Sequence, residues 1–385
     1  MVRKVAGASD NPPRLDAVKR LRGLLGPATQ KHVDFKEKLK AHYVTTERDQ
    51  RLKAEMDMLV ENVVERQDLS REIGSDNRGE GTAVAVIAES GAGKTRAMRH
   101  YLKSSRFFAG YGDPDAGCPL ITVGVKAPCT LRNLGMATLR AAGYLSRTEK
   151  RQNEAWPQAQ FQIQDQQILF VNYEEAQRII QQANSKERKQ VVETLAGLMT
   201  DPVWSLYLVL SGLPELEDLF DQQFLENPTP AQRKAHMTLR RRTRFVPFSA
   251  LDLKADRKDI DRGIKEYEKL GGVSLALLKE PEMRARLHHA GAQQLGLFWE
   301  LTVAAIDGCV RAGRKVVTKD DYSDSYAAKT LEPIELNPFE VDHWETIDTS
   351  VIQRRLDDED DQVETPARGK KGKPRTKLER HLDDT

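Results

Sequence analysis

Residues Ala88 to Thr95 constrain the fold of this chain more than any other segment. They read Ala-Glu-Ser-Gly-Ala-Gly-Lys-Thr, follow an apolar run over 83–88, and lead into a stretch compatible with a helix. A buried strand, a loop of small residues and a helix, in that order, are what a phosphate-binding loop requires. Backbone N–H groups in such a loop turn toward a polyphosphate, and the first helical turn directs its positive dipole end at the anion.

The last two residues of the motif carry the chemistry. Lys94 can reach the β- and γ-phosphates, and the Thr95 hydroxyl can bind Mg²⁺. The sequence therefore predicts ATP and Mg²⁺ as cofactors. Ala88 replaces the usual first glycine, which tightens the turn and leaves the cradle intact. A glycine-rich turn without a ligand is the alternative, but it has no need of Lys-Thr at this spacing. The predicted nucleotide-binding residues are Glu89, Ser90, Gly91, Ala92, Gly93, Lys94, Thr95 and Arg96.

Bulk composition bounds the remaining possibilities. The 385 residues suffice for one large domain or two smaller ones. Charged residues make up 31% and nearly cancel to a net +2, so total charge neither indicates nor excludes nucleic acid. Cys118, Cys129 and Cys309 show neither metal-ligand spacing nor a disulfide framework, which is typical of a reducing cytoplasm. Without a signal-peptide core or a span-length apolar stretch, we expect a cytoplasmic protein with no membrane partner.

The centre of the chain alternates strand and helix patterns, which predicts a parallel sheet covered on both faces. Helical patterns over 130–142 and 185–199 lie between apolar runs, and from 256 onward only helical patterns remain. The five predicted strands are 83–88, 120–126, 168–173, 206–211 and 245–248.

Four regions follow from these patterns. Residues 1–75 form a leader and an N-terminal helical region, and 76–252 form the α/β nucleotide-binding core. Residues 253–331 form a small helical lid. Residues 332–385 form a charged tail with an acidic run at 357–361 and a basic run at 366–377, too poor in apolar residues to fold alone.

Two adjacent carboxylates follow the strand at 168–173. We predict that Glu174 helps to bind the metal ion and that Glu175 orients or deprotonates the attacking water. Glu174 stands where Asp is usual, and its longer arm predicts slow hydrolysis because positioning dominates this chemistry. The alternative is a helix N-terminus that carries two acidic residues for its dipole.

Polar residues at two later strands complete the predicted machinery. Ser211 closes the strand at 206–211 and can sense the γ-phosphate, although a simple strand-ending turn is as good an interpretation. Four arginines stand within residues 240–244. Arg241 and Arg244 are candidates for an arginine finger that reaches a neighbouring subunit. A solvated basic face or a contact with DNA phosphates are the alternatives.

These stretches together resemble an AAA+ ATPase, and within that class the TniB/TnsC family of transposition ATPases, relatives of MuB. The likeness is carried by residues 88–95, residues 119–132, the Glu-Glu-Ala-Gln that ends at Gln177, and Ser211-Gly-Leu-Pro-Glu. The resemblance implies an α/β fold, in which an AAA+ P-loop core with a five-stranded parallel sheet and flanking helices is followed by a small all-helical lid.

The resemblance also implies a role. The ATP-bound form would assemble as a homo-oligomeric ring or filament on double-stranded DNA without sequence preference, meet a target-selector protein and recruit or activate a transposase. Oligomerisation can line up one basic loop per subunit along the phosphates, even in a nearly neutral chain. An ATP-binding scaffold with little turnover and a helicase-loader-like AAA+ regulator are the alternatives. The candidate DNA-binding residues, for which ordinary surface charge is the alternative, are Lys126, Arg132, Lys150 and Arg151.

Overall fold

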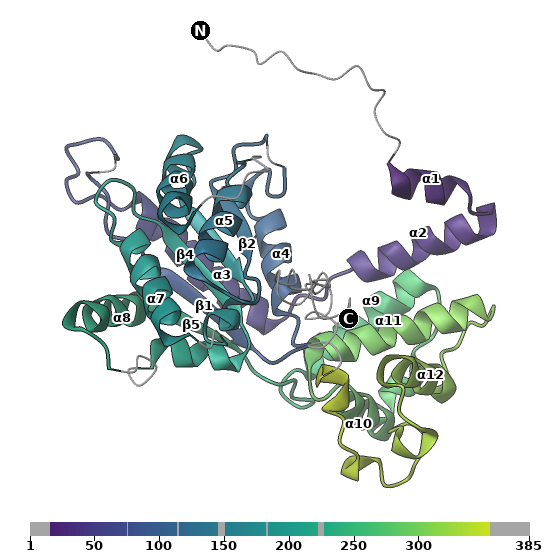
Figure 1. The fold of residues 1–385 in the computed structure, drawn as a ribbon. Coiled ribbons are helices and arrows are strands. Elements are labelled where there is room, and N and C mark those ends of the chain that lie inside the picture. The colour runs from purple at the N-terminus through teal and green to yellow at the C-terminus, as the bar shows by residue number, and fades with distance from the viewer. Residues whose placement is uncertain are drawn as a thin grey trace, which may run out of the picture. The chain divides into compact units, whose positions relative to one another are not determined.

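A computed structural model gives the structure of the protein (Figure 1). It describes residues 16–354 except 75, 114, 145–150, 182–183 and 222–226. The chain divides into two compact units. The helical unit combines Met1–Glu55, Gly91–Ser105 and Phe248–Ile352, and the α/β unit combines Met56–Ser90, Arg106–Pro247 and Gln353–Thr385.

The apolar runs of the central region form one parallel sheet of five strands, as the sequence predicts. The spatial order of the strands is β2-β3-β4-β1-β5, so the first strand lies inside the sheet, between β4 and β5. β1 pairs in parallel with β4, β4 with β3, and β3 with β2. The strands are β1 (Ala83–Ala88), β2 (Leu120–Gly124), β3 (Phe170–Glu174), β4 (Tyr207–Gly212) and β5 (Thr243–Phe248).

The core of the α/β unit lies between one face of this sheet and four helices. Alternate residues of β1, β2, β3 and β4 point to that face, among them Ala85, Tyr173 and Leu208, and all three are fully buried. On the opposite face, Phe170 packs edge-on against Phe108 with ring centroids 5.3 Å apart. The helices are α5 (Leu131–Ala141), α6 (Gln152–Asp165), α7 (Ser185–Met199) and α8 (Pro230–Arg242).

Local signals explain where these helices begin and how closely they pack. Thr130 caps α5 by accepting from the Asn133 N–H, and α8 begins with a reciprocal Thr229–Gln232 capping box. Gly135 lets α6 approach α5, since a Cβ there would lie 2.9 Å from the Trp156 Nε1. That indole N–H donates to Leu131 O over 2.9 Å, so a buried polar group is satisfied.

The helical unit packs around α11, which is apolar on nearly every side. Trp299 of α11 lies 5.2 Å from Tyr267 of α9, measured between ring centroids. Asp307 of α11 pairs with Lys36 of α2 over 3.1 Å and so fixes the N-terminal helices to this core. The elements are α1 (Ala17–Gly23), α2 (Pro27–Ala41), α3 (Glu47–Val64, shared with the α/β unit), α4 (Lys94–Ser104), α9 (Arg257–Gly271), α10 (Pro281–Ala290), α11 (Leu295–Arg311) and α12 (Lys319–Thr330).

Residues 332–352, which the sequence predicts to belong to the tail, form two short 3₁₀ turns and pack on the rest of the helical unit. Phe339 and Ile352 are buried, and the Arg286 guanidinium donates to Pro338 O and Val341 O over 2.8 and 2.7 Å. The acidic run at 357–361 and the basic run at 366–377 lie outside the described residues. Among the helices that the structure describes, none is long and apolar enough to cross a bilayer.

Candidate nucleotide-binding site

The predicted phosphate loop and the predicted hydrolytic residues start from the same edge of the sheet. Strand register places Ser211 of β4 opposite Val86 of β1 on one side and opposite Glu174 of β3 on the other. Parallel strands end at a common edge, and ligands of α/β proteins bind outside that carboxyl edge. The carboxyl end of β1, the acidic pair at the end of β3 and the serine of β4 therefore share this edge, although the chain separates them widely.

The loop has the backbone that anion binding needs. Gly91 and Gly93 adopt φ values of 78° and 94°, which glycine takes without a steric penalty. Gly93 is the N-cap of α4, and no side-chain hydrogen bond caps this helix in the described part of the chain. The first turn also carries no acidic residue. The first N–H groups of α4 therefore suit a phosphate.

Two carbonyl groups of the loop are held by residues far away in the sequence. The Leu297 N–H, in the first turn of α11, donates to Gly91 O over 3.1 Å. The Gln353 side-chain amide donates to Ser90 O over 3.1 Å. Gly296 permits the first contact, because a Cβ there would lie 2.4 Å from Gly91 O. Gly296 was not identified from the sequence, where its local signal is a glycine inside an otherwise helical pattern.

A cavity of about 540 Å³ adjoins the loop inside the helical unit. Gly91 and Gly93 form one side of it, and α2 and α11 contribute most of the rest. Its size is in the usual range for small-molecule sites. Most of its charged residues are cations, which suits a polyphosphate ligand; they are Lys36, Lys40, Arg96, Lys329, Glu300 and Asp307.

Arg96, predicted to bind nucleotide, also has a structural role. Its guanidinium donates to Lys40 O over 2.7 Å and to His42 O, and lies 5.8 Å from the centroid of the Tyr43 ring. These contacts fix the segment between α2 and α3 against α4.

The residues present fit ATP with Mg²⁺. Thr95 offers a hydroxyl in the first turn of α4, and Glu174 offers a carboxylate at the end of β3; both are the hard oxygen ligands that Mg²⁺ prefers. Among the described residues, no group of three or more His, Cys, Asp or Glu side chains could hold a metal by itself. A magnesium ion would therefore need phosphate oxygens as further ligands.

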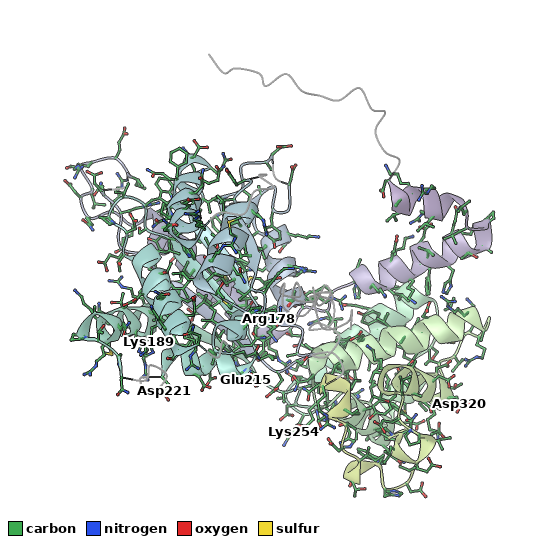
Figure 2. All side chains as sticks on the ribbon, viewed as in Figure 1. Arg178, Lys189, Glu215, Asp221, Lys254 and Asp320 are labelled. Carbon is green, nitrogen blue, oxygen red and sulfur yellow. The ribbon has the colours of Figure 1, made fainter. Side chains whose placement is uncertain are left out.

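Glu175 has an unusual backbone. Its φ of 58° and ψ of 40° lie in the left-handed region, which is uncommon for a residue with a side chain. The neighbouring Gln177 is 2% exposed, and its Nε2 donates to Glu175 Oε2 over 2.7 Å. Arg178, labelled in Figure 2, is buried and donates to Val125 O over 3.1 Å. No role for Gln177 was predicted from the sequence, since the contact depends on folding.

The predicted arginine and DNA-binding residues lie mostly at the surface. Arg241 of α8 and Arg244 of β5 are exposed, whereas Arg242 between them pairs with Glu80. Lys126 is exposed just after the edge strand β2, Arg132 is half-buried at the start of α5, and Arg151 is exposed before α6. Lys150 lies outside the described residues.

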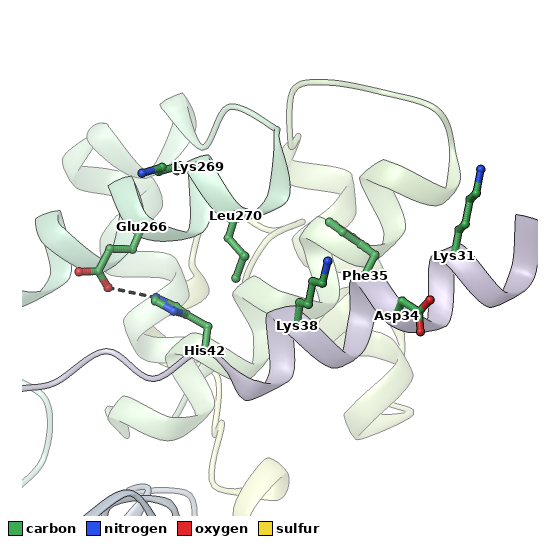
Figure 3. Close-up of a pocket in the computed structure, with 8 residues that line it drawn as sticks. All are labelled: Lys31, Asp34, Phe35, Lys38, His42, Glu266, Lys269 and Leu270. Carbon is green, nitrogen blue, oxygen red and sulfur yellow. Dashed lines mark hydrogen bonds and ion pairs between the residues drawn. The ribbon is translucent and has the colours of Figure 1, made fainter. Parts of the chain in front are cut away.

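Another cavity, of about 630 Å³, lies between α2 and α9 (Figure 3). His42 and Glu266 pair across it over 3.0 Å. In Figure 3 Lys31 and Lys38 both extend upward from α2 and Lys269 extends to the left from α9, so their ammonium groups do not converge on one point. We assign no ligand to this cavity.

The fold and the site define a P-loop protein with the AAA+ fold. Residues 77–220 match the family model described as AAA domain. The comparisons do not identify the TniB/TnsC family within this class.

Solved structures share this fold. Cdc6p from Pyrobaculum aerophilum aligns with a TM-score of 0.50 and 12% identity, over 75% of this chain and 69% of that chain. The Aeropyrum pernix ORC1 protein in complex with DNA aligns with a TM-score of 0.48 and 13% identity, over 88% of this chain and 82% of that chain. A search of curated proteins finds no match to this chain.

Proposed function

We propose that this protein binds and hydrolyses ATP with Mg²⁺ and uses the bound nucleotide as an assembly switch. The observation that carries the proposal is the common sheet edge at which β1, the strand that leads into the phosphate loop, ends beside the pair Glu174-Glu175 and Ser211. A purely structural sheet edge has no use for two carboxylates and a serine at the ends of adjacent strands, beside the strand that leads into a Lys-Thr loop.

The residues divide the work of phosphoryl transfer. Loop N–H groups and Lys94 bind the β- and γ-phosphates, while Thr95 and Glu174 hold Mg²⁺, which offsets the phosphate charge when bound. Glu175 orients the attacking water and accepts its proton. Ser211 contacts the γ-phosphate from the neighbouring strand. Glu174 in place of the usual Asp makes this hydrolysis slow, because small displacements cost large factors in rate.

The cellular role in the proposal comes from the resemblance to transposition ATPases. The ATP-bound protein assembles on duplex DNA as a homo-oligomer, meets a target selector and recruits a transposase. Arg241 and Arg244 reach the nucleotide site of a neighbouring subunit. Both residues are exposed, as this role requires. Lys126, Arg132, Lys150 and Arg151 contact DNA phosphates. A scaffold that binds ATP and hydrolyses it weakly is the second candidate function. The presence of Glu174 where Asp is usual favours it.

The substitution Glu175→Gln tests the proposal. Removing the base should lower ATP turnover by about a hundredfold or more while ATP binding persists, so the variant should remain longer on duplex DNA. We would measure phosphate release and, by electron microscopy, assemblies formed with ATP and DNA. Wild-type protein that assembles on DNA without turnover would support the scaffold. Wild-type protein that never assembles on DNA with ATP would contradict the transposition role and favour a loader-like regulator.

A further inference from the structure

A buried glutamine connects the predicted catalytic carboxylate to the neighbouring strand. Gln177 follows β3 in the 3₁₀ turn Ala176–Ile179 and is 2% exposed. Its Nε2 donates to Glu175 Oε2 over 2.7 Å, and its Oε1 accepts the Leu213 N–H over 3.2 Å. Leu213 comes directly after Ser211 and Gly212, which end β4. One side chain therefore bridges the ends of β3 and β4.

The Leu213 N–H fixes which way the amide points. A backbone N–H can only donate, so the amide atom that faces it must be the oxygen. The amide NH₂ then faces Glu175, whose ionised carboxylate can only accept. Reversing the amide would place two donors together and two acceptors together. The bridge therefore has one stable orientation.

The close approach of the two strand ends depends on a glycine. A Cβ built on Gly212 would lie 2.6 Å from Gln177 Oε1 and 3.1 Å from the Gln177 backbone nitrogen. Any larger residue at 212 would push the amide away. The missing side chain of Gly212 therefore makes space for the side chain of Gln177.

Glu175 itself needs such support. Its left-handed backbone costs free energy that the surroundings must offset, and residues held in this way concentrate at functional sites. Glu175 is half-buried, so its carboxylate can still meet water. The contact from Gln177 occupies Oε2 and leaves Oε1 as the oxygen for that water.

We propose that Gln177 is a positioning residue, which holds the Glu175 carboxylate at a fixed place relative to the end of β4 that carries Ser211. This inference rests on the proposed function, because it gives Glu175 the role of base. Gln177 itself touches neither nucleotide nor water. It couples the residue that activates water to the strand that contacts the γ-phosphate.

The substitution Gln177→Glu removes only the hydrogen-bond donor that faces Glu175. Glutamate keeps the shape and can still accept from Leu213, but it turns a carboxylate toward Glu175. We expect kcat to fall about tenfold to a hundredfold, with KM and Kd for ATP changed less than about twofold. Gln181→Glu is the matched control, since Gln181 is exposed in the same segment and should behave as wild type.

Gly212→Ala displaces the same amide without changing charge, so it should also lower kcat while KM for ATP changes little. Retained ATP affinity shows that each variant is folded. If both variants keep the wild-type kcat while Glu175→Gln is inactive, this inference alone is overturned. If the wild type has no turnover, or if Glu175→Gln matches it, the proposed function falls and this inference falls with it.

Discussion

At the scale of single residues, burial decides which charges the α/β unit tolerates. His236 of α8 is 2% exposed and its Nε2 lies 3.0 Å from Leu219 O, so the neutral ring donates to that carbonyl. Burial lowers the pKa of His236, and the nearby Arg240 lowers it further. The His236 ring therefore binds a proton less readily in the folded protein than in the unfolded chain.

The stability of the protein should then depend on pH through His236. A His whose pKa is lowered by folding binds fewer protons when folded than when unfolded, so stability falls as pH falls below about 6.5. We expect the urea midpoint to decrease between pH 7.5 and pH 5. The variant His236→Gln removes this titration and should show a smaller decrease, measured by fluorescence. Equal decreases in both proteins would show that His236 does not contribute.

At the scale of elements, the contact between the first turn of α11 and the phosphate loop depends on one glycine. A Cβ on Gly296 would lie 2.4 Å from Gly91 O and 3.1 Å from Gly93 N. Backbone atoms cannot move aside as a flexible side chain can. Alanine at 296 must therefore displace either α11 or the loop.

We expect Gly296→Ala to weaken ATP binding at least about tenfold and to lower stability by about 1–3 kcal/mol. Gly308→Ala in the same helix is the control. Its Cβ would meet nothing closer than 3.6 Å, so removing a helical glycine there should stabilise by about 0.5–1 kcal/mol. Urea unfolding and nucleotide titration measure both effects. A Gly296→Ala variant as stable and as tight-binding as Gly308→Ala would contradict the contact.

The sequence predicted the elements better than the contacts between them. Apolar runs located all five strands, since a buried parallel strand needs such a run, but the ends differ: the predicted strand 168–173 is observed as Phe170–Glu174. The positions of Glu174 and Ser211 at the ends of β3 and β4 were predictable, because polar residues that end buried strands stand out. The bridge from Gln177 to Leu213 and the fit of Gly296 against the loop were not, because both join residues that only the fold brings together.

At the scale of the whole molecule, near-neutral charge would make the proposed DNA binding depend on assembly. A net charge of +2 gives one subunit little attraction for a phosphate backbone. Several subunits that each present Lys126 and Arg132 would add their contacts, and binding would then weaken steeply with salt. Because ATP would control how many subunits assemble, every expectation about DNA depends on nucleotide binding.

Titration calorimetry of ATP with Mg²⁺ into the full chain therefore measures the step on which the proposed switch depends, with Lys94→Ala as the matched variant. We predict saturable binding at one site in the wild type and its loss in Lys94→Ala, with circular dichroism showing both proteins folded. Folded wild-type protein that takes up no ATP, or a Lys94→Ala variant that binds it equally well, would contradict a nucleotide site in this loop.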